Sequence, residues 1–215
     1  MIVAAARRRL GPSLMVAAML ALTLTGVTAT PAAAVSTGIV VSQVYGGGGN
    51  TGAPFTNDFV ELFNRGTSPA SVAGWSLQYA SATGTGNVGA NSGQLTELPD
   101  VTLAPGQYLL VQEAGGATGA PLPTPDVTDA TPIAMAAGAG KVALVTGTAS
   151  LGCNGGSTPC PPAALARIVD LVGYGSANFF EGTGPTPPPG NTTAAVRGAG
   201  GCTDTDQNAA DITAA

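Results

Sequence analysis

Hydrophobic and polar residues alternate along most of the chain after residue 34, in short runs that end at Gly, Pro, Asn or Ser. This period of two predicts β-strands, because successive side chains of a strand point to opposite faces. The expected strands cover residues 38–46, 58–64, 71–80, 107–112, 132–136, 141–147, 167–175 and 193–197. No long helical period interrupts them. The pattern therefore predicts an all-β fold, a β-sandwich of about seven to nine short strands.

The strand expected at 58–64 brings Asp58, Glu61 and Asn64 close together, and such residues can act as catalytic acids or metal ligands. Strand geometry places Glu61 on one face and Asn64 on the other. Asn64 also opens a turn, where its side chain can bond nearby backbone groups. We therefore interpret the three as strand carboxylates and a turn former. The alternative is metal binding by Asp58 or Glu61 near a loop.

Gly74 interrupts the alternation in the segment expected as a strand at 71–80. We interpret this glycine as a bulge, which shifts the phase of the strand so that Trp75 faces the core. The inward residues are then Val72, Trp75, Leu77 and Tyr79, and the outward residues are Ser76, Gln78 and Ala80.

The first 34 residues have the pattern of a secretory signal peptide. Three arginines at 7–9 precede an uncharged apolar run over 10–27, and the small residues 32–34 fit an Ala-x-Ala cleavage site. We expect cleavage after Ala34, a secreted protein without a membrane anchor, and one mature domain over 35–215. A transmembrane anchor is the alternative, but the run contains Gly, Pro and Thr and lacks a charged stop.

The mature part is strongly acidic, which argues against nucleic acid as a partner of this domain. Of its 215 − 34 = 181 residues, four are basic and twelve are acidic, so its net charge is 4 − 12 = −8. Nucleic-acid affinity comes chiefly from Lys and Arg at phosphates. The chain also has no His, which removes the commonest general base, the Ser-His-Asp triad and histidine-ligated zinc. No catalytic residue is assigned.

Four segments together resemble the lamin tail domain, an immunoglobulin-like sandwich. They are "VELFNRGTSPASVAGWSLQYA" (60–80), "LAPGQYLLV" (103–111), "KVALV" (141–145) and "IVDLVGYG" (168–175). More narrowly, they are similar to the version at the N-terminus of secreted bacterial nucleases of the endonuclease/exonuclease/phosphatase type. The resemblance spans about residues 40–211. Those nucleases continue into a catalytic domain where this sequence ends, so the resemblance implies an accessory module and carries no enzymatic activity with it.

The segment "GCTDTDQNAAD" near the end of the chain places oxygen-bearing side chains at alternate positions. Asp204, Asp206 and Asn208 are followed by Asp211 three residues further on. This spacing resembles the start of a calcium loop, in which the oxygens converge on one hard cation. An EF-hand is excluded because the sixth position holds no Gly and the twelfth no Glu. We predict a weak calcium site and no other cofactor; the alternative is a solvated acidic turn.

The three cysteines fit an exported protein. Cys153 and Cys160 bracket the turn-forming insert "NGGSTP", so a disulfide between them is expected. Cys202 is then the odd one out, although the sequence allows it to replace either partner. A catalytic thiol is not expected, because no His can activate it.

Two classes of function remain open. The favoured one is a secreted, non-catalytic, lamin-tail-like module that binds an unidentified protein or extracellular surface ligand, alone or beside a nuclease domain. The other is a metal-dependent hydrolase, such as a nuclease, that uses carboxylates. The absence of His and of a paired-acid pattern favours the module.

Overall fold

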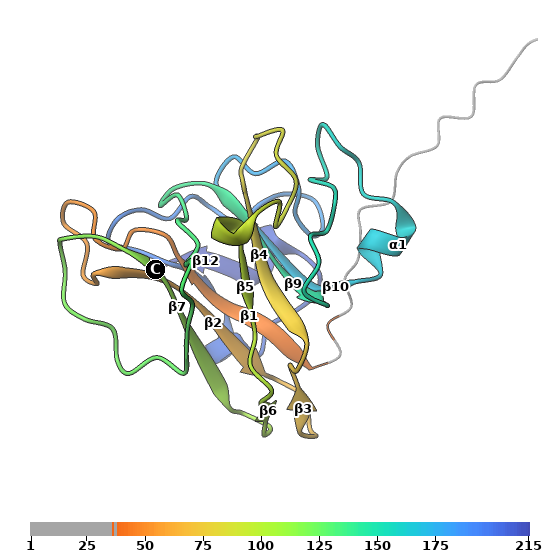
Figure 1. Ribbon diagram of the computed structural model, residues 1–215, viewed down its shortest axis with the longest axis horizontal. Coiled ribbons are helices and arrows are strands. Elements are labelled where there is room, and N and C mark those ends of the chain that lie inside the picture. The colour runs from red at the N-terminus through yellow and green to blue at the C-terminus, as the bar shows by residue number, and fades with distance from the viewer. Residues whose placement is uncertain (1–35, 37) are drawn as a thin grey trace, which may run out of the picture. The chain divides into compact units, whose positions relative to one another are not determined.

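The computed structural model describes residue 36 and residues 38–215, which form an all-β structure (Figure 1). The strands are β1 (Ile39–Tyr45), β2 (Asn57–Asn64), β3 (Ala70–Ser71), β4 (Trp75–Ser81), β5 (Leu95–Glu97), β6 (Thr102–Leu103), β7 (Tyr108–Gly115), β8 (Val127–Thr128), β9 (Gly140–Thr146), β10 (Ile168–Tyr174), β11 (Ala195–Arg197) and β12 (Ile212–Ala214). The short helices are α1 (Pro162–Leu165) and α2 (Asn208–Asp211), and 3₁₀ turns lie at Ser92–Gln94 and Ala199–Gly201.

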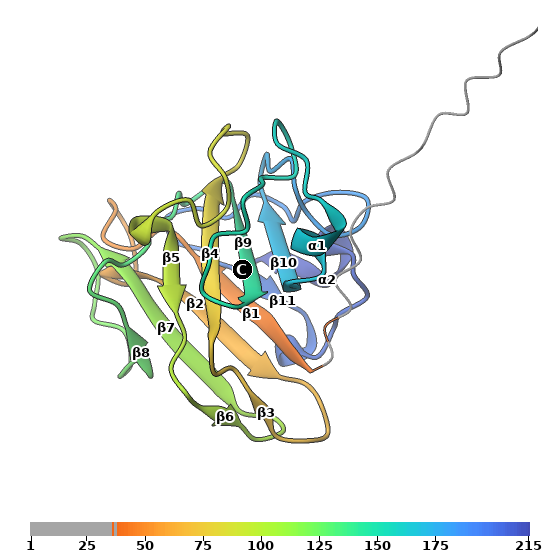
Figure 2. The ribbon, with the colours of Figure 1, turned by 45° about the vertical axis from the view of Figure 1, so that its right-hand side comes forward.

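The strands form a six-stranded sheet with the order β12-β11-β1-β2-β7-β8, a four-stranded sheet with the order β10-β9-β4-β5, and the pair β3-β6. Neighbouring strands are antiparallel except β7 and β8, which are parallel. Figure 2 shows the four-stranded sheet lying in front of the layer that contains β1, β2 and β7.

The core lies between the two larger sheets. Alternate residues of β2, such as Val60 and Leu62, pack in one buried cluster with Leu77 of β4 and with Val142 and Leu144 of β9. Burying an aliphatic side chain contributes roughly 1.5–3 kcal/mol, so this face of each strand supplies much of the driving force for folding. The predicted immunoglobulin-like β-sandwich is confirmed, and β1, β2, β7, β9, β10 and β11 occupy predicted positions with small shifts at their ends.

The strand predicted at 132–136 is wrong. These residues form a loop between β8 and β9 rather than a strand. Two of their backbone N–H groups donate to carboxylates instead of to a neighbouring strand: Ile133 N to Glu113 (2.7 Å) and Met135 N to Asp58 (2.9 Å). The apolar alternation of this segment does reflect burial, because Ile133 and Met135 are buried. Carboxylate side chains, however, accept from the backbone N–H groups that a neighbouring strand would bind in a sheet.

The bulge predicted at Gly74 is also wrong. The segment breaks into β3, which pairs with β6, and β4, which joins the four-stranded sheet. A turn separates them: Trp75 N donates to Val72 O (3.0 Å), and Gly74 has a φ of 71°, which favours glycine. Trp75 begins β4 at the edge of the core and is only partly buried, whereas Val72 is fully buried.

The predicted outward face of β4 is buried as well. Ser76, Gln78 and Ala80 are each at most 1% exposed, because the loop after β9 folds over them. Ser76 Oγ donates to Gly147 O (2.7 Å), and Gln78 Nε2 donates to Ala149 O (3.0 Å). The polar side chains of this strand therefore form buried hydrogen bonds with the loop after β9 and do not contact water.

Strands β5, β6, β8 and β12 have no counterpart in the predicted set. They contain two or three residues each, and alternation cannot be recognised over so few positions. β5 and β8 pair with the longer strands β4 and β7, whereas β6 and β12 pair with β3 and β11, which are equally short.

The expected disulfide between Cys153 and Cys160 is confirmed. Cys202 is a free thiol and is exposed. The predicted signal peptide and its cleavage site after Ala34 lie outside the described residues. Among the residues that are described, none forms a helix of the length and apolar character that a membrane crossing requires.

Candidate functional site

The acidic cluster at the end of the chain surrounds Arg197, the last residue of β11. The Arg197 side chain is 0% exposed, and its Nη2 donates to both carboxylate oxygens of Asp170 on β10 (2.9 and 2.8 Å). Strands β11 and β10 belong to different sheets, so this buried ion pair joins the two layers. Removing two charges from water is costly, and the pair is tolerable only if all its polar atoms find partners.

Val41 of β1 supplies those partners. The register between β1 and β2 shifts between Val41 and Gln43, so Ser42 is the extra residue of a β-bulge, and Val41 lies directly before it, still opposite Leu62. Val41 N donates to Asp170 Oδ2 (2.6 Å), and Arg197 Nε donates to Val41 O (3.0 Å). The ion pair therefore satisfies the backbone groups of Val41 and is itself held by them.

Asp204 is bound by two arginines. Its Oδ1 accepts from Arg197 Nη1 (3.1 Å), and its Oδ2 lies 3.4 Å from Arg65 Nη1 and accepts from the Ser36 hydroxyl. The negative charge of Asp204, which the sequence analysis assigned to a calcium site, is therefore partly balanced by Arg65 and Arg197. Neither Arg65 nor Arg197 was singled out as a site residue from the sequence.

Asp211 organises the turn that precedes α2. Its carboxylate accepts from Thr205 N (2.7 Å), from the Thr205 hydroxyl (2.8 Å) and from Gln207 N (3.2 Å). These hydrogen bonds stabilise the charged form. Burial is the largest single influence and acts to raise the pKa of Asp211. The hydrogen bonds together outweigh it, so the pKa of Asp211 is lowered.

Asn208 points away from the predicted cation and closes the edge of β10. It is 0% exposed; its Oδ1 accepts from Gly173 N (2.8 Å), and its Nδ2 donates to Leu171 O (2.8 Å). Glu181 Oε1 accepts from Leu171 N (3.1 Å) beside it. Burial, and next the charge of Asp170, raise the pKa of Glu181 to about 10. Asn208 and Glu181 thus replace a neighbouring strand.

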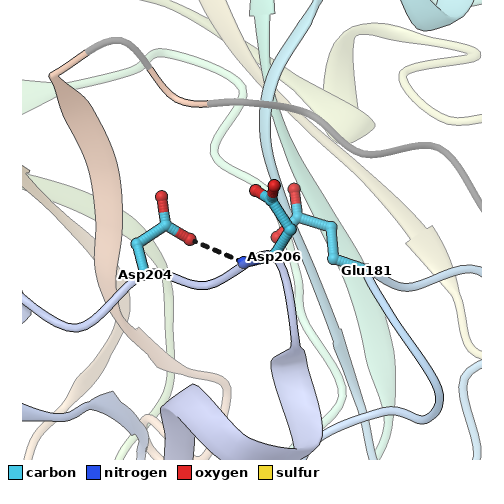
Figure 3. Close-up of side chains that lie close together, drawn as sticks. All are labelled: Glu181, Asp204 and Asp206. Atoms are coloured by element: carbon cyan, nitrogen blue, oxygen red, sulfur yellow. Dashed lines mark hydrogen bonds between the residues drawn. The ribbon is translucent and has the colours of Figure 1, made fainter.

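Three carboxylates do come together, but they are a different set from the one predicted. One oxygen each from Glu181, Asp204 and Asp206 lies within 4.8 Å of the others (Figure 3). Asp206 has a φ of 55°, a conformation that Asp adopts more readily than most residues. Burial, then the charges of Asp204 and Asp211, raise the pKa of Asp206. Asp204 and Asp206 thus share a possible cation position with Glu181, while Asn208 and Asp211 bind backbone groups.

The residues of β2 that suggested catalysis do not converge. Asn64 is buried at the end of the strand, where its Nδ2 donates to Ser68 O (3.0 Å) and Leu103 O (2.8 Å). Glu61 lies on the other face beside a cavity of about 120 Å³ and accepts from the Ser42 hydroxyl (2.7 Å). This cavity is smaller than the roughly 300 Å³ of the smallest common ligand pockets. The geometry fits the interpretation as strand carboxylate and turn former.

Asp58 and Glu113 form a second group of buried acids at the other end of the core. Asp58 accepts from Gly48 N (2.8 Å) and Met135 N, and Glu113 Oε2 accepts from Ile133 N and the Thr96 hydroxyl (3.1 Å). Within the described residues, Glu113 Oε1 is a buried oxygen without a hydrogen-bond partner.

Burial raises the pKa of Asp58 to about 6. Burial, with smaller contributions from the charges of Asp129 and Asp58, raises the pKa of Glu113 to about 7. The two acids fix the loop 132–136 to the sandwich, and both are poised to titrate near neutral pH.

Sequence reasoning missed Arg197, Asp170, Glu181 and Glu113. One signal was present: Asp170 stands alone in the apolar run "IVDLVGYG" (168–175), and an acid in a buried strand requires a partner. The identity of that partner, 27 residues further along the chain, could not be read from the sequence.

Comparison with known families gives one match. The model of the lamin tail domain family matches residues 32–156, more than half of the 215 residues. No curated protein matches the chain. The acidic cluster around Arg197 lies beyond the matched residues, whereas Asp58 and Glu113 lie within them.

We predict that Arg197→Met lowers the free energy of unfolding by about 3–5 kcal/mol, because Asp170 is left buried without its partner. Urea denaturation measures the change. The double variant Arg197→Met and Asp170→Leu should lose less unfolding free energy than the sum of the losses of the two single variants. Arg65→Met is the matched control and should cost at most about 1 kcal/mol, since its ion pair is partly exposed. Equal losses in Arg197→Met and Arg65→Met would contradict the structural role of the pair.

We also predict that the protein becomes more stable as the pH falls from 8 to 5. Asp and Glu of an unfolded chain titrate near pH 4, whereas folded Glu113 and Asp58 take up protons near pH 7 and 6. The folded state therefore binds more protons across this window, and its stability is lost as the pH rises. Glu113→Gln should flatten the dependence of the unfolding free energy on pH by at most about 3 kcal/mol. Glu97→Gln, at an exposed position, is the control; a parental slope in Glu113→Gln would refute the assignment.

Proposed function

Because the chain belongs to the lamin tail domain family, we propose that it acts as a secreted, non-catalytic module that binds a protein or another extracellular ligand. The N-terminal arginines, apolar run and Ala-x-Ala segment support export. The disulfide supports an oxidising destination. A family of immunoglobulin-like domains is compatible with a binding role, in which loops and sheet edges present the contact surface.

The observation that carries the non-catalytic assignment is the state of the basic side chains. Arg65 and Arg197 are bound to Asp204, and Lys141 and Arg167 donate to carbonyl or amide oxygens of the chain. In the described part of the chain, each of the four basic side chains is thus already engaged. Phosphodiester hydrolysis requires positive charge around the phosphate and a base that activates water. Nucleic acid is therefore a poor candidate for the partner.

The finer resemblance concerns the lamin tail domains at the N-terminus of secreted bacterial nucleases. We extend the proposal to this version: the module accompanies a nuclease domain and contributes binding rather than hydrolysis. The net charge of −8 for residues 35–215 supports this division, because a DNA-cleaving domain would have to supply the contacts with phosphate.

We predict that the purified mature protein does not nick plasmid DNA in the presence of Mg²⁺, Mn²⁺ or Ca²⁺. Gel electrophoresis after prolonged incubation measures conversion of supercoiled DNA to the open form, with a known nuclease as positive control. Cleavage that disappears in Glu61→Gln or Asp204→Asn would overturn the non-catalytic assignment and favour the metal-dependent hydrolase.

We further propose that calcium binds between Glu181, Asp204 and Asp206 and fixes the C-terminal segment to the sandwich. The close approach of one oxygen from each residue supports this proposal. Carboxylates also outnumber arginines there: Asp170, Asp204, Asp206 and Asp211 surround Arg197 and Arg65. Calcium accepts oxygen ligands in flexible geometry, and extracellular sites are filled at dissociation constants of about 10⁻⁴ to 10⁻³ M.

At a calcium concentration about ten times the dissociation constant, the melting temperature should rise by roughly 3–5 °C relative to chelator. Differential scanning fluorimetry measures the shift. Asp206→Asn removes one ligand charge but keeps a residue that tolerates the same backbone conformation, and it should abolish the shift. Asp100→Asn, at an exposed position elsewhere, should preserve it. An equal shift in Asp206→Asn and the parent would contradict the calcium site and support the interpretation as an acidic turn bound by arginine.

A further inference from the structure

A groove of about 600 Å³ lies beside β5, the last strand of the four-stranded sheet. It is lined by Leu95 and Glu97 of β5 and by residues from three loops, at 89–92, 129–131 and 148–150. Its volume lies within the range of roughly 300–1,000 Å³ that is typical of ligand sites. Figure 2 shows β5 at the border of its sheet, with β4 on one side only.

Among the strands that the structure describes, none pairs with the outer backbone edge of β5. At the end of the β4–β5 ladder, Leu98 N donates to Trp75 O (2.9 Å). Because hydrogen bonds of an antiparallel strand alternate between its two edges, the N–H and C=O groups of Leu95 and Glu97 point away from β4. Outside that ladder, the described structure contains no hydrogen bond from these groups. They are free to pair with another extended chain.

The opposite edge of the same sheet, at β10, is covered. The side chains of Glu181 and Asn208 form hydrogen bonds with backbone groups of Leu171 and Gly173. Thr186 N also donates to Gly173 O (2.8 Å). An exposed strand edge is a template for pairing and is normally covered. The fold covers the β10 edge with buried side chains but leaves β5 facing a groove.

The groove is acidic. Glu97 and Asp129 line it, and none of its described lining residues is basic. Arg167 supports the loop 148–150, with its guanidinium bound to carbonyls of Ala149 and Ser150. A second copy of this chain, with a net charge of −8 over residues 35–215, would meet like charge. The charge therefore selects against self-association and for a basic partner.

We propose that the β5 edge and its groove bind an extended, basic polypeptide segment, which adds to the sheet as a further strand. Backbone hydrogen bonds to Leu95 and Glu97 would hold the segment. Lys or Arg at alternate positions would lie on one face of the added strand, within reach of Glu97 and Asp129. This inference rests on the proposed binding function and names its partner class and site.

The probe is a fluorescein-labelled peptide of sequence Lys-Thr-Lys-Val-Lys-Thr-Lys, titrated with the full mature protein and followed by fluorescence anisotropy. Two peptides of matched length serve as controls: the same sequence with Glu in place of Lys, and the Lys peptide with alternate backbone nitrogens methylated. The first tests charge, and the second removes the hydrogen bonds of one strand edge without changing charge. Both should bind at least about tenfold more weakly, a change of about 1.4 kcal/mol or more.

Variants of the protein locate the site. The double substitution Glu97→Gln and Asp129→Asn should weaken the binding of the Lys peptide by about tenfold, because it removes both acidic groups that line the groove. Asp129→Asn keeps the oxygen that accepts from Thr131 N. The matched control, Asp100→Asn combined with Asp126→Asn, changes the net charge equally and should leave the affinity unchanged.

Three results would overturn the proposal: equal binding of the methylated peptide, equal weakening in the matched control, or no saturable binding of the Lys peptide. The same protein preparations are tested for plasmid cleavage. Absence of peptide binding without cleavage refutes this site but leaves the non-catalytic module intact. Cleavage of plasmid refutes the module itself.

Discussion

The buried ion pair between Arg197 and Asp170 is the constraint on which the C-terminal part of the structure depends. It joins a strand of the six-stranded sheet to a strand of the four-stranded sheet, with both side chains at most 1% exposed. A charge pair in this position is stable only because the backbone of Val41, beside the bulge in β1, offers one donor and one acceptor to it. Arg197 also forms an ion pair with Asp204, and this contact attaches the segment after β11 to the sandwich.

Acidic side chains serve this fold mainly as substitutes for strand partners. Asp58 and Glu113 bind the backbone of the loop 132–136, and Glu181 binds the backbone of β10. Asp211 does the same for the turn before α2. Each of these carboxylates has at least one oxygen that accepts from backbone N–H groups of a loop or strand edge. The acidic composition therefore reflects how loops are attached as much as any chemistry at a site.

The groove beside β5 is linked to the core through one of these attachments. Asp129 and residue 131 form part of its wall, and Ile133, two residues further on, is held by buried Glu113. The shape of an exposed surface thus depends on a buried carboxylate whose pKa burial raises to about 7. Membership of the lamin tail domain family accounts for the sandwich, and the acidic edge of β5 is the feature by which this chain would select a partner.

The sequence by itself determined the sandwich and its long strands, because burial of one face imposes a period of two that survives in the amino-acid pattern. It also favoured the disulfide between Cys153 and Cys160, which are close along the chain, but left Cys202 open as a partner; the structure decided the pairing. It could not determine the fate of 132–136 or of Ser76 and Gln78, because alternation does not reveal whether a loop or water covers a strand.

The acidic cluster shows the same limit. Alternate spacing brought Asp204 and Asp206 to notice, but Asn208 and Asp211 bind backbone groups, and Glu181 joins the carboxylates from a distant segment. Only the tertiary structure decided these partners, because the hydrogen bonds and charges that fix a polar side chain come from residues far apart in the chain.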